Sequence, residues 1–251
     1  MQQDQQTTPS HDTRLTYLGR RLTEAFDELW DNFVDPADSL YDLDGTRWTR
    51  LGGDGVPGAS PDATLGNEQQ LAEVRNQCRA LAATNEFAIN GHENRVSYVV
   101  GTGHTYRIVA RKDCDASQQT IRQAQAVLDE FLHVNKWHQR QQEIVRRKDR
   151  DGECFLRLFA VDDGTTIVRF VEPDQVTTPT GRSGDPAASL GIQTDPHDVE
   201  TVIGYWIDGR LVDGAELQHR KLGVDANVRR GLPLFYPVRK NLRRAEKLLR
   251  N

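Results

Sequence analysis

Three acidic residues, Asp151, Glu153 and Glu172, are the side chains in this 251-residue sequence best placed to do chemistry. Carboxylates that converge on one pocket can hold a divalent metal ion, as a metal-dependent nuclease requires. No Lys accompanies them at E-x-K spacing, and the Asp151-Gly152 pair is equally typical of a turn. A metal-dependent nucleic-acid enzyme is therefore an alternative that needs these three carboxylates to meet in space.

The histidines and glycines form no recognisable catalytic or metal-binding motif. The sequence has no H-x-H or H-x-x-x-H pair, no G-x-S-x-G and no P-loop. The histidines considered as ligands stand singly: His104, His133, His138 and His219. Gly101-Thr102-Gly103 follows a helical stretch and precedes a strand-like one, the reverse of a dinucleotide loop, so it predicts a turn. We expect no enzyme activity, no catalytic residue, no cofactor and no metal.

The three cysteines indicate reduced thiols. Cys78, Cys114 and Cys154 are far apart and odd in number, which favours neither a disulfide framework nor a metal cluster. Isolated cysteines usually behave as small buried hydrophobic residues. The sequence also lacks the ~18 consecutive apolar residues of a membrane span and the apolar stretch of a secretory signal. We therefore expect a cytoplasmic origin and no membrane partner.

Charge is distributed unevenly along the chain. Residues 1–66 carry twelve acidic side chains against five Lys and Arg, whereas residues 220–251 carry ten Lys and Arg against two acids. Ends of opposite charge suit contact between neighbouring subunits or a basic segment that faces nucleic acid. Phosphate contact needs no reading of bases, because neutralised phosphates release counterions. The candidates for contact with DNA or a neighbouring subunit are Arg229, Arg230, Arg239, Lys240, Arg243, Arg244 and Lys247.

The N-terminal part of the sequence predicts a helix followed by an irregular arm. Residues 1–12 are rich in Gln, Thr and Asp and should be disordered. From Thr13 to Phe33, apolar residues recur every three or four positions, which indicates an amphipathic helix. Residues 43–66 are punctuated by Gly and Pro, which are typical of a linker or a partner-wrapping arm. Residues 13–66 are thus expected to be a helix plus an arm.

Residues 67–237 predict one α+β domain. Asn67 can cap its first helix, and residues 105–111 alternate as a short strand. The predicted helices cover 67–85, 87–100 and 117–148. The predicted strands cover 153–161, 165–172, 199–207 and 210–220, and a D-G turn joins the first two as a hairpin. We expect several helices packed on a small mixed, mainly antiparallel sheet.

Residues 238–251 predict a last helix, rich in basic residues, that ends without a cap. A helix with no terminating Gly or turn suggests that the natural chain continues beyond Asn251. We therefore expect this segment to be the start of a longer, truncated helix.

A series of short motifs runs through most of the chain in a fixed order. They are VRNQCRALAATNEFAINGHENRVSYVVGTG (74–103), DGECFLRLF (151–159), FVEPDQV (170–176), LGIQTDPHDVETVIGYWID (190–208), AELQHRK (215–221) and RRGLPLFYPVRKNLRRAEKL (229–248). In this order and spacing they resemble segments of the portal proteins of tailed phages of the lambda type. The chain is identified by them as the N-terminal half of such a protein, with a wing-like α+β region and the start of a stem-type helix.

The resemblance implies a structural subunit of a ring, commonly of twelve copies, at one capsid vertex of a phage or prophage. Double-stranded DNA would pass through the ring during packaging by the terminase large subunit and during ejection. Capsid and head-completion proteins would be further partners, and the ring would join head to tail. The subunit would lie in the virion, after assembly in the host cytoplasm. A monomeric DNA-binding adaptor acting through residues 229–250 is the main alternative to this role.

Overall fold

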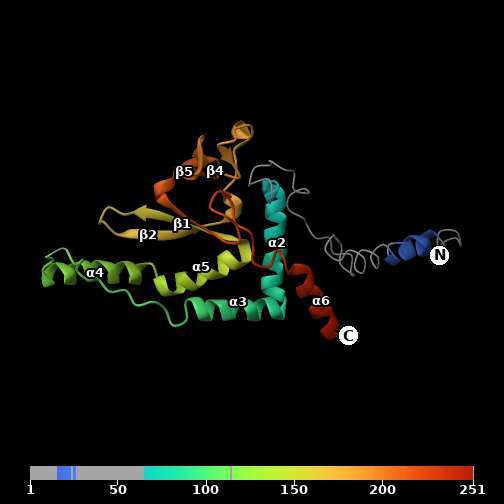
Figure 1. Ribbon diagram of the computed structural model, residues 1–251, viewed down its shortest axis with the longest axis horizontal. Helices are drawn as coiled ribbons and strands as arrows, with labels where there is room; N and C mark the ends of the chain where they lie inside the picture. Colours follow the sequence, from blue (N-terminus) through green and yellow to red (C-terminus); the bar gives the residue numbers. More distant parts are fainter. Residues whose placement is uncertain (1–15, 24, 27–64, 114, 251) are drawn as a thin grey trace, which may run out of the picture. The chain divides into compact units, whose positions relative to one another are not determined.

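The computed structural model describes residues 16–23, 25–26, 65–113 and 115–250, and the chain divides into two compact units, residues 1–50 and 51–251 (Figure 1). In the first unit, residues 16–23 and 25–26 are helical, as the apolar spacing predicts. Tyr17, Leu18 and Leu22 on this helix are exposed. The predicted disordered start, Thr13, Phe33 and nearly all of the 43–66 arm lie outside the described residues.

The second unit has the predicted α+β fold. Its helices are α2 (Glu68–Thr84), α3 (Glu86–Val99), α4 (Gln118–Val134), α5 (Trp137–Asp151) and α6 (Arg239–Arg250). Its strands are β1 (Glu153–Ala160), β2 (Thr166–Val171), β3 (Ala188–Ser189), β4 (Ile192–Asp195), β5 (Asp198–Ile207), β6 (Arg210–Asp213) and β7 (Leu217–Lys221). None of the described helices is both long and apolar enough to cross a membrane.

The strands form two small sheets rather than the single sheet expected. One has the order β2-β1-β7 and the other the order β3-β4-β5-β6, and every described strand pair is antiparallel. The predicted hairpin is confirmed: β1 and β2 pair from Phe155 with Val171 to Ala160 with Thr166. Gly164 in the connecting turn has a positive φ of 85°, which glycine adopts without strain.

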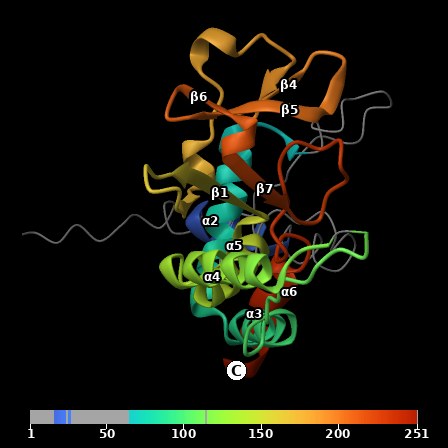
Figure 2. The same ribbon diagram turned by 90° about the vertical axis from the view of Figure 1, so that its left-hand side faces the viewer.

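The helices lie against one side of the β2-β1-β7 sheet. α5 contacts β1 on one side and α3 on the other, α4 continues roughly in line with α5, and α2 crosses their end (Figures 1 and 2). Asn67 caps α2 through a reciprocal pair of bonds with Gln70, as the sequence predicts. Asn85 caps α3 at the elbow between α2 and α3.

The predicted helix over residues 117–148 is wrong, because the chain breaks into α4 and α5 at Asn135 and Lys136. Lys136 has a left-handed φ of 46°, and Asn135 is fully enclosed. The Asn135 amide donates to the carbonyl of Thr166 at 2.9 Å, and its oxygen accepts from the N–H of Val168 at 2.8 Å. These bonds to β2 outweigh a helical turn, because a buried edge strand needs partners for its peptide groups.

The predicted strand over residues 105–111 is also wrong, because this segment does not pair with any described strand. The chain runs there without a helix, turn or bend, but no described strand pairs with it. The alternating sequence therefore forms no ladder within the described part of the chain.

Two apolar clusters hold the sheets and helices together. Phe155 lies between the sheets with Val176, Ile192, Tyr205 and Leu217. On the other face of β1 and β2, Cys154, Leu156 and Val168 pack against the α4–α5 helices at Phe131, Trp137 and Ile144. A third cluster buries Leu65, from the end of the predicted arm, against Leu190 and Val228. Leu65 is thus an apolar anchor directly before α2.

The cysteines described are free thiols in the interior. Cys78 and Cys154 are both buried, and burial raises the pKa of each thiol to about 12. The prediction that the cysteines behave as small buried hydrophobic residues is confirmed for these two, and Cys114 lies outside the described residues.

We predict that Asn135→Ala lowers the free energy of unfolding by about 2–4 kcal/mol, because it leaves buried peptide groups of Thr166 and Val168 without partners. Urea unfolding followed by circular dichroism measures the loss. The matched change Asn94→Ala, on an exposed face of α3, should lose no stability. An Asn135→Ala variant as stable as the wild type would contradict this account of the break between α4 and α5.

Candidate nucleic-acid and subunit interface

Arg230 and Glu153 form a buried ion pair at the junction of the two sheets. Their side chains are 1% and 0% exposed. The Arg230 Nε lies 2.8 and 2.9 Å from the two Glu153 oxygens. The remaining guanidinium nitrogens donate to the carbonyls of Pro173, Val176 and Leu190, each at 2.9 Å. Every nitrogen of the Arg230 guanidinium is thus used inside the protein, and none of it is available to DNA.

The charge on Glu153 is stabilised by several neighbours. His219 Nε2 lies 2.9 Å from Glu153 Oε2, and the His219 ring stacks on Phe155 with centroids 4.1 Å apart. Burial alone would raise the pKa of Glu153, but the charge of Arg230 and the hydrogen bond from His219 outweigh it and hold the pKa well below its usual range. Burial lowers the pKa of His219 more than Glu153 raises it. A neutral His219 therefore donates to an ionised Glu153.

Further arginines surround this pair and neutralise the other carboxylates. Arg79 contacts Asp151 at 2.6 Å and Asp174 at 3.0 Å. Asp174 also accepts from Arg75 at 2.6 Å. Glu172 accepts from Arg147 at 2.6 Å. The helices α2 and α5 are thereby tied to the segment after β2 by ion pairs.

The nuclease alternative required Asp151, Glu153 and Glu172 to converge on a metal ion. The structure instead gives each of them an arginine at 2.6 to 2.8 Å. Within the described residues, no group of three or more His, Cys, Asp or Glu side chains could hold a metal. These carboxylates are part of the framework.

Two glycines allow the chain before α6 to approach β1. Gly152 ends α5 with a positive φ of 82°, and its carbonyl accepts from the N–H of Leu222 at 2.8 Å. A Cβ atom on Gly231 would collide with the Gly152 carbonyl oxygen. The N–H of Leu234 donates to the carbonyl of Asp149 at 2.8 Å. The glycines beside Glu153 and Arg230 are therefore required by the same junction.

The sequence motifs meet at this junction, which the sequence alone did not predict. Each motif supplies at least one group to it: Arg75 and Arg79, Asp151 and Glu153, Glu172 and Asp174, the Leu190 carbonyl, His219, and Arg230. The sequence did offer one signal of the junction: charged residues or glycines occur in each of several short motifs that lie far apart along the chain. We name this set the Arg230 junction.

Three of the predicted DNA or interface residues serve the protein's own packing. Arg230 is the centre of the junction. Arg229 is half-buried and donates to Ser189 Oγ and Thr194 Oγ1, each at 2.9 Å. Arg239 is 6% exposed, lies 4.3 Å from the centre of the Tyr236 ring and donates to the Tyr236 carbonyl.

The other candidates lie further along α6. Lys240, Arg243 and Arg244 are half-buried, and Arg243 pairs with Glu246 at 3.3 Å. The Lys247 side chain lies outside the described residues. Asn85 fixes the helix, because its amide donates to the Leu242 carbonyl at 3.2 Å and to Glu246 at 3.1 Å. α6 is thus held at the α2–α3 elbow with basic residues along it.

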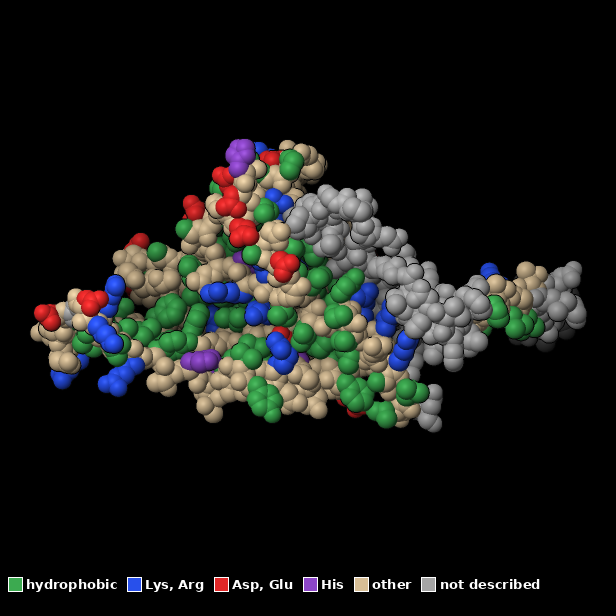
Figure 3. Space-filling view, viewed as in Figure 1, with side chains coloured by type: hydrophobic (Ala, Val, Ile, Leu, Met, Phe, Trp, Pro, Cys, Tyr) green, Lys and Arg blue, Asp and Glu red, His purple; other side chains and the backbone are tan. Residues whose placement is uncertain are grey.

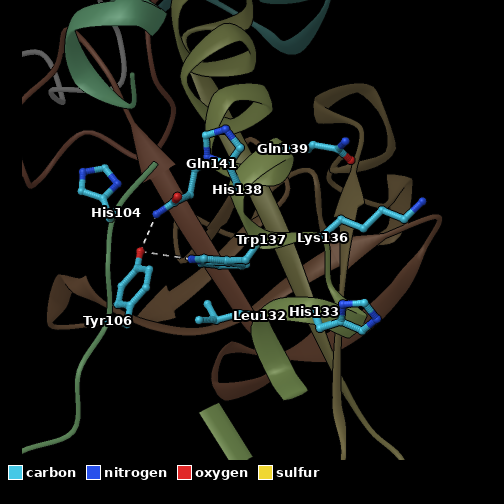
Figure 4. A pocket seen from close by; sticks show the side chains of 9 residues that line it. All are labelled: His104, Tyr106, Leu132, His133, Lys136, Trp137, His138, Gln139 and Gln141. Atoms are coloured by element: carbon cyan, nitrogen blue, oxygen red, sulfur yellow. Dashed lines mark hydrogen bonds between the residues drawn. The ribbon is translucent and has the colours of Figure 1, made fainter. Parts of the chain in front are cut away.

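A hollow of about 620 Å³ lies between the segment after α3 and the α4–α5 break (Figure 4). Tyr106 is its polar centre, because its hydroxyl accepts from Trp137 Nε1 at 3.2 Å and from the Gln141 amide. His133 and His138 also line the hollow and point in different directions, as their five-residue spacing predicts. The hollow is open and aromatic.

Charged side chains are unevenly spread over the second unit. Asp and Glu side chains gather over the β4–β5 sheet, whereas most Lys and Arg side chains in the same view lie below it (Figure 3). The surface thus offers regions of opposite charge.

The comparison with protein families decides the identity. A family model described as phage portal protein, lambda family, matches residues 47–249. The chain belongs to this family. The resemblance read from the motifs is therefore confirmed, and the matched range includes residues 47–66 of the predicted 43–66 arm. No curated protein matches the sequence significantly. Portal proteins of this family are structural, form rings and belong to the capsid.

We predict that Arg230→Met lowers the free energy of unfolding by about 3–5 kcal/mol, because the buried Glu153 charge loses its closest arginine and keeps Arg75 at 3.6 Å and the His219 hydrogen bond. Urea unfolding measures the loss. Arg230→Met combined with Glu153→Gln should recover part of it, since position 153 then carries no charge. The exposed Arg220→Met change should alter stability by no more than about 0.5 kcal/mol. Equal losses in the single and double variants would show that the ion pair is not the cause.

The acid sensitivity of the domain should depend on Asp174. Burial would raise the pKa of Asp174, but the hydrogen bond and charge of Arg75, and then those of Arg79, outweigh it and lower the pKa. Its stabilising contribution is complete above the unfolded-state pKa of about 3.9 and disappears as the pH falls through the lower folded-state pKa. Asp174→Asn should therefore lose stability less steeply than the wild type below about pH 4. Unfolding curves at a series of pH values test this, and the exposed change Asp113→Asn should keep the wild-type slope.

Proposed function

We propose that this chain is a subunit of the portal ring at one vertex of a phage or prophage capsid, where the ring forms the channel for DNA packaging and ejection and the attachment point for the tail. The observation that carries the proposal is the family match over residues 47–249, which spans the whole Arg230 junction. A ring of about twelve copies is the expected assembly. Its expected partners are double-stranded DNA, the terminase large subunit, and capsid and head-completion proteins.

The basic residues of α6 support an interaction with DNA or with a neighbouring subunit. Lys240, Arg243 and Arg244 lie along a helix that Asn85 and Glu246 hold in place, so their positions are set before any partner binds. Positive side chains on a rigid helix can neutralise phosphates without reading sequence. A channel that passes any genome sequence needs this kind of interaction.

A monomeric DNA-binding adaptor is the second candidate, because the same three α6 residues would serve it equally. The two candidates differ in assembly and agree in DNA binding. The mass of the particle, measured by light scattering and electron microscopy, therefore separates them. A closed ring of about a dozen copies supports the portal proposal. A chain that stays monomeric and binds DNA overturns it in favour of the adaptor.

We predict that Lys240→Glu combined with Arg244→Glu weakens DNA binding at least tenfold and makes the dependence of affinity on salt less steep, by about one unit of slope for each phosphate that the helix no longer neutralises. Titration of labelled duplex DNA at several salt concentrations measures both. Arg182→Glu combined with Arg220→Glu applies the same charge change to exposed positions away from α6 and should leave the slope unchanged. Equal weakening by both pairs would show that net charge, and not α6, governs the affinity.

A further inference from the structure

We propose that residues 104–111 are an edge strand that pairs with β6 of a second copy of this chain, so that adjacent subunits share hydrogen-bonded backbone. The inference rests on the proposed ring, because a ring requires each subunit to offer two different faces to its neighbours. It names the segments that form those faces.

On one edge of the segment, the side chain of Gln125 makes the two hydrogen bonds that a neighbouring strand would make. The Gln125 oxygen accepts from the N–H of Ile108 at 2.8 Å, and the Gln125 amide nitrogen donates to the carbonyl of Tyr106 at 3.3 Å. A residue in a neighbouring parallel strand would bond to the same two groups. The Gln125 side chain therefore holds the backbone around Arg107 in a conformation that can pair with another strand.

The opposite edge of the segment faces away from α4. Because successive peptide groups of an extended chain point in opposite directions, the N–H and C=O groups of Thr105, Arg107 and Val109 point away from Gln125. No described strand pairs with them. An open row of backbone donors and acceptors is a template for a strand from another chain.

The side chains of the segment suit a protein partner of negative charge. Val109 is 72% exposed. Arg107 and Arg111 lie two positions to either side of Val109 and so share its face, and both are exposed. The face combines one apolar side chain with two positive charges.

The β6 strand carries the complementary features. It is an edge of its sheet, with β5 on one side and no described strand on the other. Leu211 is 47% exposed on it. Exposed acidic residues on β6 and in the turns beside it, Asp208, Asp213 and Glu216, outnumber its one exposed basic residue, Arg210. The β6 edge therefore offers both an apolar side chain and the opposite charge.

The two edges lie on opposite sides of the second unit, as a ring requires. In Figure 2, β6 is on the left above the β1 strand, and the loop that contains residues 104–113 projects to the right beside α4. One subunit can therefore give its 104–111 segment to one neighbour and receive a segment at β6 from the other. The aromatic hollow at Tyr106 and Trp137 borders residues 104–111 and can accommodate a side chain of the neighbouring subunit.

Cysteine cross-linking tests the pairing directly. Val109→Cys and Leu211→Cys are introduced into the full chain with Cys114→Ser, since Cys78 and Cys154 are buried and should not react. A short bis-maleimide cross-linker should convert the double variant into a ladder of multimers on a denaturing gel. A mixture of the two single variants should give dimers alone, and each single variant by itself should give monomers. Absence of the ladder and of the mixed dimer overturns the proposal.

A proline variant separates backbone pairing from mere proximity. Val109→Pro removes an outward N–H and leaves the two groups held by Gln125 in place, so the thermal unfolding of the subunit should not change. Subunit association should weaken at least tenfold. Val109→Thr keeps the N–H and the β-branched shape and should associate like the wild type. Unchanged association of Val109→Pro overturns the proposal.

The particle mass keeps the two proposals apart. If the wild type forms a ring and the cysteine variants give neither ladder nor mixed dimer, the strand pairing is wrong and the portal function still stands. If the wild type is monomeric and the cysteine variants give no cross-link, both proposals are wrong.

Discussion

The Arg230–Glu153 pair is the interaction on which the rest of this fold depends. Removing two charges from water is costly, and the cost is offset only where every donor and acceptor finds a partner with good geometry. Here the partners come from β1, the turn after β2, Leu190 and β7, and α2 adds its own arginines around them. A misplaced element would leave a buried charge without a partner. The pair therefore selects one arrangement of elements that are otherwise joined by modest apolar clusters.

Local structure was predictable wherever the cause was local. The capped start of α2 at Asn67, the β1–β2 hairpin and the α6 helix follow from cap residues, a D-G turn and apolar spacing, all within a few residues of the feature itself. The break between α4 and α5 was not predictable in this way. Asn135 interrupts the helix because β2, some thirty residues away, needs its amide. Nothing in the helical periodicity around Asn135 carries that information.

The candidate site shows the same limit for charge. Arg229, Arg230 and Arg239 look like Lys240 and Arg244 in the sequence, yet they are used inside the protein. Basic residues in a run form a binding surface only where their side chains face solvent. Arg230 does not, because its partner Glu153 lies 77 positions earlier in the chain and is buried with it. The family motifs did contain the missing information, because each supplies a group to the same junction. In this chain the motifs build a framework.

The close approach of Gly152 and Gly231 has a mechanical consequence. The N–H of Leu234, in the segment before α6, donates to the carbonyl of Asp149 at the end of α5. The N–H of Leu232 donates to the carbonyl of Leu222, whose own N–H donates to the carbonyl of Gly152 at the start of β1. No side chain lies between the backbones of Gly152 and Gly231. The two backbone segments can therefore move very little relative to each other, because peptide hydrogen bonds break before they stretch appreciably. A pull or push on α6 would therefore reach the β2-β1-β7 sheet as a rigid displacement. The subunit would respond to a load on this helix as a lever, with the two glycines as its fulcrum.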